Sequence, residues 1–493
     1  MAQALVADDD GTLWFGSASG LYRVGDGKAA RVGDDSAVFA LHRDRQDRLW
    51  VGREDGLYRV ASAGSALVRA WPAAGEDGAV VRALAQAPDG RLWLALAGGG
   101  LLRLDPDTGA ALRVRANPDV PGSLPEPSIG ALLVDRSGLL WAGGQIRGVS
   151  VTDPAGTPLR YLVDDTPGGA LGRSSIRAVV QDDDGALWMG TDVGRLLRHG
   201  LDAGGFEDLT NRMPAPWTVL DDTLQDSTAV SRIMAFERAG PGRAWMATNK
   251  GLFLLDTAAR TVRAVDVVGG TVPSLRSLAL GRDGTLWLGA VDGLYRYRPD
   301  NGWLDRITRA TPASGGGLVH ALEVDRLGHV WFGTSDGLGL YEPATQRLRR
   351  FRHAVDDARS LAGDLVRALH ESADGALWVG THSGLGRAQV AGDRVAFSHP
   401  LATALDDHAV STVFSIAESP AGTLWLGTDN GIVRFEPGRD GGVRHFAQSD
   451  GLQDVEFNGG AAAVLRDGRV AMGGVAGLNV FDPARIRATA YAA

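Results

Sequence analysis

Short apolar stretches separated by polar turns recur along the whole chain. In one well-preserved copy, residues 366–369 and 377–380 are apolar stretches, and the turns at 373–375 and 382–384 both end in glycine. Short stretches bounded by turn residues predict β-strands, and glycine favours tight turns because it adopts positive φ without steric cost. Helical periodicity is absent over any useful length. The pattern therefore predicts an all-β protein.

The pattern is an internal repeat, and its most regular feature is a tryptophan. The first copy reads DGTLWFGSASGLYR over residues 10–23. An eleventh copy has Ala471 in the tryptophan position, and ten copies carry the tryptophan itself, at Trp14, Trp50, Trp93, Trp141, Trp188, Trp245, Trp287, Trp331, Trp378 and Trp425. Successive copies lie 36 to 57 residues apart, a period that suits one propeller blade. We therefore expect an all-β β-propeller with eleven four-stranded blade repeats.

The repeated tryptophan has a structural and a functional interpretation. A large flat side chain can wedge between neighbouring blades and bury much apolar area, or it can stack on the face of a sugar. A ligand would not be bound eleven times, so the structural interpretation is favoured for the repeated positions. Trp71, Trp217 and Trp303 lie outside the motif and are better candidates for ligand contact.

Eleven blades exceed a single ring, since propeller rings typically have four to eight blades. We therefore expect two domains: residues 1–166 as the blades of an incomplete N-terminal ring, and residues 167–493 as a complete seven-bladed C-terminal ring. Both ends of the sequence look cut from a longer polypeptide. The longest interval between copies contains residues 201–226, which predict either a rim loop or a seam between rings.

Composition narrows the choice of partners. The formal net charge is −9 and lysine occurs only at Lys28 and Lys250, so we expect no nucleic-acid partner. No apolar run approaches the ~20 residues that cross a bilayer, and no signal peptide is visible at the start. The absence of cysteine excludes disulfides and thiolate zinc sites.

The catalytic and metal-binding patterns in the sequence are weak. Residues 333–337, GTSDG, match the Gly-x-Ser-x-Gly nucleophile motif, but that motif needs a strand-to-helix turn, and here the pentad is one repeat's turn. Isolated histidines on strands, such as His320 and His370, are more often structural than metal ligands. The run at 8–11, DDDG, lacks the spacing of a calcium loop. We therefore predict no catalytic residue, no metal site and no cofactor.

The positions at which the repeats differ are the candidates for ligand binding. In a propeller, the turn between the second and third strands of a blade shares a face with the loop that enters the blade, and that face commonly binds ligands. Charged groups there can bond to sugar hydroxyls or to an acidic substituent, although turns are also polar simply because they meet water. The predicted ligand-binding residues in these turns are Arg53, Glu54, Arg147, Asp192, Lys250, His382 and Asp429.

The repeats resemble the two-component regulator propeller repeat. The best copies of its pattern, Asp-x-x-Gly-x-Leu-Trp-x-Gly-Thr-x-x-Gly-Leu, are residues 373–385 and 421–432. The segment 358–366, ARSLAGDLV, is similar to the family's lead-in to a first strand. Residues 450–461 and 477–483 are similar to the family's distinctive last repeat. The chain departs from the family in having eleven repeats instead of about fourteen.

The resemblance implies the periplasmic sensor region of a bacterial signal-transduction receptor. Such receptors carry two propellers, an immunoglobulin-like domain, a membrane helix and an output module that is a kinase, a hybrid kinase-regulator or a diguanylate cyclase. Characterised relatives mostly sense carbohydrate oligomers, and the full receptor can be a homodimer. The sequence therefore favours a sensor of a small molecule or oligosaccharide. The alternatives are an enzyme like the streptogramin lyases, which are also propellers, and a protein-interaction scaffold.

Overall fold

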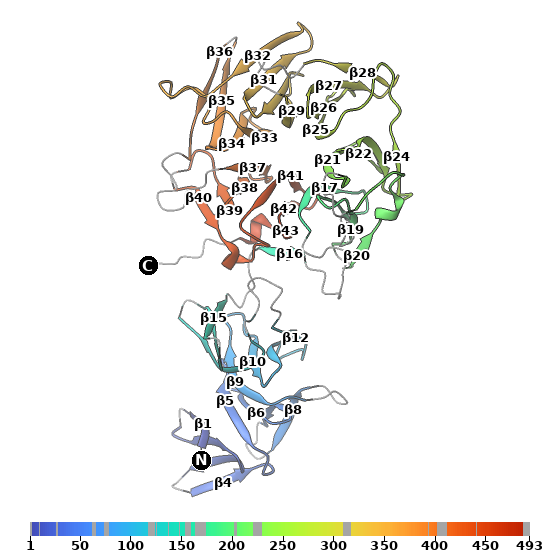
Figure 1. Ribbon diagram of the computed structural model, residues 1–493. Coiled ribbons are helices and arrows are strands. Elements are labelled where there is room, and N and C mark those ends of the chain that lie inside the picture. Colours follow the sequence, from blue (N-terminus) through green and yellow to red (C-terminus); the bar gives the residue numbers. More distant parts are fainter. Residues whose placement is uncertain are drawn as a thin grey trace. The chain divides into compact units, whose positions relative to one another are not determined.

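The computed structural model describes residues 2–8, 10–25, 28–61, 66–72, 78–116, 124, 126–136, 138–146, 148–152, 159–162, 174–201, 205–219, 229–308, 317–392, 394–401, 412–439 and 441–486. The chain divides into two compact units, Met1–Thr157 and Pro158–Ala493 (Figure 1). The predicted boundary between residues 166 and 167 lies outside the described residues.

Almost all regular structure is antiparallel β-sheet. In the described part of the chain, the helices are three short 3-10 turns: η1 (Thr210–Arg212), η2 (Gln448–Asp450) and η3 (Pro483–Arg485). The described strands form eleven sheets, ten with four strands and one with three. The predicted all-β propeller fold is therefore confirmed.

The N-terminal unit contains four sheets in chain order. Their first strands, β1, β5, β9 and β13, lie side by side in that order. The strands are β1 (Ala2–Ala7), β2 (Leu13–Ser17), β3 (Gly20–Gly25), β4 (Lys28–Val32), β5 (Val38–Arg43), β6 (Leu49–Arg53), β7 (Gly56–Val60), β8 (Leu67–Trp71), β9 (Val81–Gln86), β10 (Leu92–Leu96), β11 (Gly100–Leu104), β12 (Ala111–Val114), β13 (Ile129–Val134), β14 (Leu140–Gly144) and β15 (Val149–Thr152).

The C-terminal unit contains seven sheets. Its strands are β16 (Arg160–Leu162), β17 (Ile176–Gln181), β18 (Leu187–Thr191), β19 (Leu196–His199), β20 (Phe206–Asp208), β21 (Ile233–Arg238), β22 (Arg243–Thr248), β23 (Gly251–Asp256), β24 (Thr261–Ala264), β25 (Leu275–Leu280), β26 (Leu286–Ala290), β27 (Gly293–Arg298), β28 (Trp303–Arg306), β29 (Val319–Val324), β30 (Val330–Thr334), β31 (Gly337–Glu342), β32 (Arg347–Phe351), β33 (Val366–Glu371), β34 (Leu377–Thr381), β35 (Gly384–Ala391), β36 (Arg394–Ser398), β37 (Val413–Glu418), β38 (Leu424–Thr428), β39 (Gly431–Phe435), β40 (Val443–Phe446), β41 (Phe457–Val464), β42 (Val470–Gly474) and β43 (Gly477–Phe481).

The seven sheets of the C-terminal unit surround a common axis. Their first strands contact one another in a closed order, β17, β21, β25, β29, β33, β37, β41 and back to β17. Figure 1 shows the sheets radiating from this centre, from green at β17 to red at β43. The last sheet takes its outer strand from the start of the unit, because β16 pairs antiparallel with β43. The two ends of the unit are therefore joined by backbone hydrogen bonds in one sheet.

The repeated tryptophans of the C-terminal unit are core residues. Each is at most 9% exposed, at Trp188, Trp245, Trp287, Trp331, Trp378 and Trp425. The aspartate that opens each regular repeat bonds to the tryptophan six residues later: the Trp331 indole N–H donates to the Asp325 carboxylate at 3.0 Å, and Trp188 donates to Asp182 at 2.9 Å. The motif therefore pairs a buried aromatic ring with the acceptor that its one polar atom needs.

The three tryptophans outside the motif differ in their surroundings. Trp71 ends strand β8 and is only 8% exposed, so it is a core residue. Trp303 lies on the outer strand β28, is 43% exposed and donates its indole N–H to Asp305 at 2.6 Å. Trp217 is partly buried, donates to the Gly194 carbonyl at 2.7 Å and packs edge-on against Phe253.

The threonine of the Gly-Thr-x-x-Gly pattern builds the turn between the second and third strands. The Thr381 hydroxyl donates to the Gly384 carbonyl at 3.1 Å and accepts the backbone N–H of Ser383 at 3.1 Å. The same pair of bonds occurs at Thr248, Thr334 and Thr428. Gly384 has φ +103°, a left-handed conformation that favours glycine. The hydroxyl therefore closes the turn, and the two residues after the threonine are free to vary.

Candidate functional site

Backbone hydrogen bonds place the variable turns of the C-terminal unit on one face. The first variable residue of a turn donates its N–H to the carbonyl of the residue just before the first strand of the same sheet: Asp192 to Ser175 at 3.1 Å, His382 to Leu365 at 3.1 Å, and Asp429 to Thr412 at 3.3 Å. We call this side, where first strands begin, the front face, and the opposite side, with the turns between first and second strands, the back face.

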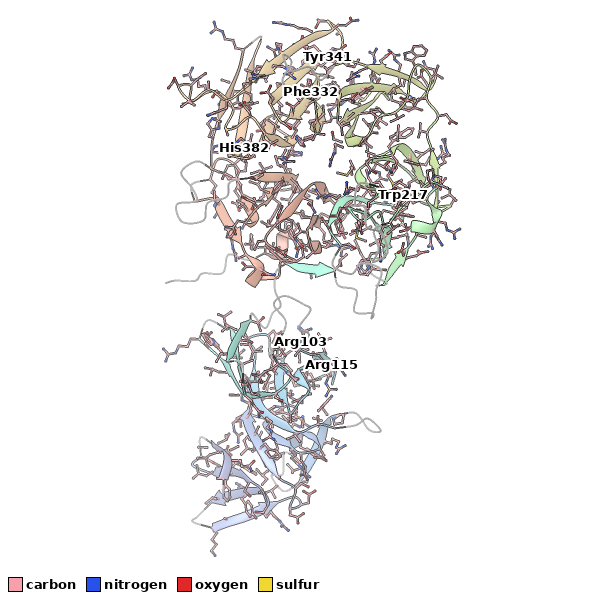
Figure 2. The ribbon with its side chains drawn as sticks, viewed as in Figure 1. Arg103, Arg115, Trp217, Phe332, Tyr341 and His382 are labelled. Carbon is pink, nitrogen blue, oxygen red and sulfur yellow. The ribbon has the colours of Figure 1, made fainter. Side chains whose placement is uncertain are left out.

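Four predicted residues lie on the front face, each on a different sheet: Asp192, Lys250, His382 and Asp429. Lys250 and His382 are exposed, while the two aspartates are partly buried. His382 Nδ1 accepts the Leu365 N–H at 3.3 Å, so the ring N–H of the neutral imidazole is on Nε2. The Asp429 carboxylate accepts the Thr412 N–H at 3.0 Å. Figure 2 shows His382 and Trp217 on opposite sides of the C-terminal unit.

The other three predicted residues belong to the N-terminal unit, so the structure does not bring all seven into one site. Arg53 is 5% exposed, forms ion pairs with Asp34 at 3.0 Å and Asp55 at 3.5 Å, and stacks its guanidinium over the Tyr58 ring at 4.4 Å. Glu54, next to it, is exposed. Arg147 lies outside the described residues. Ligand binding by these three residues stays a prediction.

A β-bulge interrupts the first strand of each sheet of the C-terminal unit near the front face. In β17, Ile176 and Ala178 pair with consecutive residues of β18, so Arg177 has no partner in the ladder. The same skip occurs in β21, β25, β29, β33 and β37. A bulge turns the side chain of the extra residue away from its regular direction. The residues at the bulge are Arg177, Met234, Arg276, His320, Arg367 and Phe414.

The side chains at these bulges contact their neighbours around the axis. Arg276 Nη1 lies 4.0 Å from the Met234 sulfur, and Arg367 Nη1 lies 3.4 Å from His320 Nδ1. The Arg367 guanidinium also lies over the Phe414 ring, 5.9 Å from its centre. We call Arg177, Arg276 and Arg367, together with His320, the axial cluster. Burial and the charges of Arg177, Arg232 and Arg367 lower the pKa of Arg276.

One front-face turn is joined to the axial cluster by a serine–histidine hydrogen bond. Ser335 is the first variable residue of its turn, and its hydroxyl lies 2.9 Å from His320 Nε2. Burial and the charges of Arg367 and Arg276 lower the pKa of His320 to about 4, so this ring is neutral at neutral pH. Because arginine only donates, His320 Nδ1 accepts from Arg367, and the ring proton is on Nε2.

The ring proton on Nε2 decides whether His320 can act as a base toward Ser335. His320 Nε2 donates to the Ser335 oxygen, whereas a general base would have to accept the serine proton at this atom. The contact therefore orients the hydroxyl and does not activate it, which agrees with the expectation that Ser335 is not a nucleophile. The Ser335 O–H is left to donate to another group at the front face.

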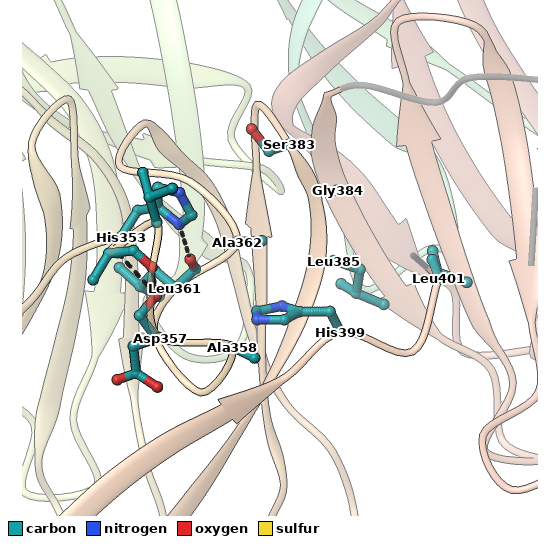
Figure 3. A pocket seen from close by; sticks show the side chains of 13 residues that line it. His353, Asp357, Ala358, Leu361, Ala362, Ser383, Gly384, Leu385, His399 and Leu401 are labelled. Atoms are coloured by element: carbon teal, nitrogen blue, oxygen red, sulfur yellow. Dashed lines mark hydrogen bonds between the residues drawn. The ribbon is translucent and has the colours of Figure 1, made fainter. Parts of the chain in front are cut away.

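A cavity of the front face borders the turn that contains His382, since Ser383 and Gly384 line it. It has a volume of about 530 Å³ and is lined by the segment that leads into β33, by the start of β35 with the residue before it, and by His399 and Leu401 after β36. Figure 3 shows the His399 ring reaching between two loops toward Ala358 and Ala362, with His353 on the far side. His353 Nδ1 bonds to the Leu361 carbonyl at 2.7 Å, while His399 Nδ1 is buried without a partner.

The sequence did not predict the axial cluster. The variable turns predicted Asp192, Lys250, His382 and Asp429 as candidates. The residue type at the second position of each first strand varies just as strongly between the sheets. Aligning the first strands reveals the variable position, but only the bulge shows that its side chain turns toward the axis. Across the described residues, no group of three or more acidic or histidine side chains is placed to hold a metal ion.

Comparison with family models agrees with the repeat. Residues 170–193 match the model described as Two component regulator propeller, which confirms the resemblance of the repeats to that family. A search of curated proteins found no match. No helix in the described part of the chain is long and apolar enough to cross a membrane.

Solved structures with the same fold include two extracellular domains from B. thetaiotaomicron. The domain of BT3049, assigned as a hybrid two-component system, is 19% identical, with a TM-score of 0.69 over 97% of this chain and 61% of that chain. The domain of BT4673, assigned likewise, is 18% identical, with a TM-score of 0.52 over 98% of this chain and 64% of that chain. The chain thus spans less than two thirds of either domain. A virginiamycin B lyase from Staphylococcus aureus, 13% identical over 65% of this chain and 98% of that chain, reaches a TM-score of only 0.47, which carries no argument.

Proposed function

We propose that this chain is the ligand-binding sensor region of a signal-transduction receptor and that it binds its ligand on the front face of the C-terminal unit. One observation carries the proposal: the ring holds side chains of different chemistry on one rigid face, one sheet after another. Asp192, Lys250, His382 and Asp429 occupy equivalent turns, so their differences are not required by the fold. A surface that varies on a fixed scaffold is typical of recognition.

The chemistry of the face suits a polar ligand. Donors are available at Lys250, at Nε2 of His382 and at the Ser335 hydroxyl, and the carboxylates of Asp192 and Asp429 are acceptors. Oligosaccharides present hydroxyls that both donate and accept, and a cavity of about 530 Å³ beside His382 has room for a sugar residue. We therefore propose a carbohydrate or a related small polar molecule as the ligand class.

The proposed sensor role includes a cellular location for this chain and signalling modules that receive its signal. The fold is that of extracellular domains assigned to two-component systems, which supports a periplasmic or extracellular place for this chain. A sensor of this kind passes its signal to further modules, and we propose an immunoglobulin-like domain followed by a kinase or cyclase, in a receptor that can dimerise.

A binding screen tests the proposal. The full chain is titrated with a panel of neutral and acidic oligosaccharides, first by thermal shift and then by calorimetry, since a ligand that binds only the folded state raises the melting temperature. The double variant K250A/H382A should bind the best ligand at least ten-fold more weakly and remain folded, because both side chains are exposed. The back-face variant Arg282→Ala should bind like the wild type. Equal binding by all three proteins would place the ligand elsewhere.

A further inference from the structure

The last sheet of the C-terminal unit has a larger bulge than the other six. Phe457 pairs with Gly474 and Ala462 pairs with Met472, so residues 458–461 of β41 lie opposite the single residue Gly473. The extra residues reach across the axis, since β41 contacts β21, β29 and β33 in addition to its neighbours β17 and β37. A Cβ added at Gly460 would lie 3.2 Å from the Met234 carbonyl oxygen, and one at Gly459 would lie 3.4 Å from that of Phe414.

This bulge is tied into the ring. The Asn458 side chain is 4% exposed and donates to the Ser175 hydroxyl at 3.0 Å and to the Ile176 carbonyl at 2.9 Å, next to Arg177. The backbone of Gly459 and Gly460 therefore lies at the level of the other bulges. A Cβ added at Gly460 would lie 3.5 Å from the Arg177 carbonyl oxygen, and one at Gly459 would lie 3.9 Å from that of Arg367, so this backbone lies beside two residues of the axial cluster.

The arginines of the axial cluster lack the partners that other arginines of this protein have. Arg198, Arg296 and Arg326 each pair with a carboxylate of their own surroundings. Within the described part of the chain, Arg177, Arg276 and Arg367 have no carboxylate within 4.0 Å, and Arg367 Nε is buried without a hydrogen-bond partner. All three side chains are partly buried.

Partly buried like charges with no counter-charge are costly, because each guanidinium loses solvent and repels the others. The whole chain has a formal charge of −9, so the local excess of positive charge at this place is opposite in sign to the overall charge. The planar guanidinium presents a fork of donors that matches carboxylate and sulfate oxygens in pairs. His320 adds no charge here because it is neutral, but through its Nε2 it orients the Ser335 hydroxyl beside the cluster.

From these contacts we infer that the axial cluster is an anion-binding site, and that it receives a carboxylate or sulfate group of the ligand at the centre of the front face. This deepens the proposed function, on which it rests for the identity of the ligand, by assigning an acidic saccharide. Arg177, Arg276 and Arg367 hold the anion, the Ser335 hydroxyl donates to it from the rim, and Gly459 and Gly460 let the backbone of β41 pass close to the bulges of the neighbouring strands.

Inorganic sulfate and monosaccharides are the probes for this site. The melting temperature of the full chain is measured in sulfate and in chloride at equal ionic strength, because sulfate also stabilises proteins without binding. Arg276→Gln removes one charge of the cluster, and Arg282→Gln removes one at the other end of the same β25–β26 hairpin. Calorimetry then compares D-glucuronate with D-glucose.

The site predicts an unusual combination of effects. Arg276→Gln should raise the melting temperature in chloride, because it relieves repulsion, and should lose at least ten-fold in affinity for sulfate and glucuronate. Arg282→Gln should keep the wild-type response to both probes. Arg367→Gln should repeat the loss, so that a folding defect in one variant does not decide the outcome. Glucose should bind at least ten-fold more weakly than glucuronate.

Two outcomes overturn the inference. An equal sulfate response of the wild type, Arg276→Gln and Arg282→Gln means that sulfate acts on the whole surface and that the cluster binds no anion. A neutral oligosaccharide that binds the front face and is unaffected by Arg276→Gln leaves the proposed function standing without this site. Failure of every saccharide, with sulfate still bound at the cluster, instead contradicts the proposed carbohydrate ligand.

Discussion

At the scale of the residue, the repeat motif is a set of hydrogen bonds. The opening aspartate accepts from the indole of the tryptophan six residues later, as Asp325 does from Trp331 and Asp182 from Trp188. Where the aspartate is absent, the bond can be lost: Ser419 stands in that position for Trp425, whose Nε1 is buried without a partner. This repeat thus keeps the apolar contribution of the ring and gives up the polar one.

Replacing the aspartate should therefore cost more than replacing the serine that stands in its position before Trp425. Asp325→Ala leaves the Trp331 indole without an acceptor and also removes bonds from the backbone N–H groups of Leu327 and His329, so the free energy of unfolding should fall by about 1–3 kcal/mol. Ser419→Ala removes only its bond to the Thr423 carbonyl, and the expected loss is about 0.5–1 kcal/mol. Urea denaturation of both variants measures the difference, and equal losses would refute the pairing.

The charge of one buried glutamate should make stability depend on pH. Burial and the neighbouring carboxylates Glu237, Glu371 and Asp325 raise the pKa of Glu323 to about 8, above its usual value. The folded state therefore holds a proton that the unfolded state has already released, so the free energy of unfolding falls as pH rises toward 8, by at most about 1.4 kcal/mol per pH unit. Burial also raises the pKa of Glu237 to about 7, which acts in the same direction.

Glu323→Gln should flatten this dependence between pH 7.5 and 8.5, a window above the usual histidine pKa of about 6.5, so that His320 is almost entirely neutral in both states and adds little slope. Denaturation series at several pH values measure the slope. The exposed Glu54→Gln is the matched control and should leave the slope unchanged. A steeper or unaltered slope in Glu323→Gln would show that Glu323 is already ionised in the folded protein.

At the scale of the element, the first strand combines uniform and variable positions. Residues such as Ala178 and Ala368 pack against neighbouring sheets. The position just before them, occupied by Arg177 and Arg367, lies in a bulge, and its residue type varies among the sheets. The first strand of the last sheet, β41, carries the largest bulge, and this bulge brings Gly459 and Gly460 to the axis. One short strand thus separates the positions that pack against neighbouring sheets from the positions to which we assign ligand binding.

The axial glycine should be more sensitive to substitution than an open one of similar conformation. Gly460 has φ +77°, and a Cβ there would meet the Met234 carbonyl oxygen at 3.2 Å. Gly438 has φ +81°, but a Cβ there would meet nothing within 4 Å. Both substitutions to alanine carry the cost of the left-handed conformation, about 1–2 kcal/mol, and Gly460→Ala adds a steric cost. If thermal denaturation ranks Gly438→Ala as the worse variant, the axial placement of β41 is contradicted.

The repeats predicted the strands well because their signals are local. Apolar stretches, glycine turns and the tryptophan each act within a few residues, and the structure places strands and turns where the pattern indicated them. The pairing of β16 with β43 joins residues more than 300 apart along the chain and has no local signal, so the sequence could not reveal it. The axial cluster was missed for a similar reason, since its members meet only once the first strands stand side by side.

The candidate site was predicted in part. The shared face of the variable turns followed from strand direction alone, and the backbone bonds of Asp192, His382 and Asp429 agree with it. Charge alone did not reveal the surroundings of Arg53, whose guanidinium is buried between Asp34, Asp55 and the Tyr58 ring. Whether a charged turn residue meets solvent or a buried partner depends on neighbouring strands that the turn sequence does not contain.

At the scale of the whole molecule, the chain joins a row of four sheets to a unit of seven. In the larger unit the first strands contact one another in a closed order, and the first and last described strands share a sheet. Under the proposed function, such a scaffold offers a ligand contacts that are already in place, so that little ordering is needed on binding. The proposed recognition would then depend on which residues occupy the turns and the bulges.

Hydrogen exchange of the full chain, with and without the saccharide that gives the largest thermal shift, tests this account most directly. Binding on the front face predicts protection of the turns 191–194, 248–251, 334–337, 381–384 and 428–431 and of the bulge at 458–461, because exchange slows where a ligand holds the backbone closed. The back-face turns 182–185, 325–328 and 372–375 should exchange as they do in the free protein. Protection confined to the back face, or to the N-terminal unit, would contradict the account.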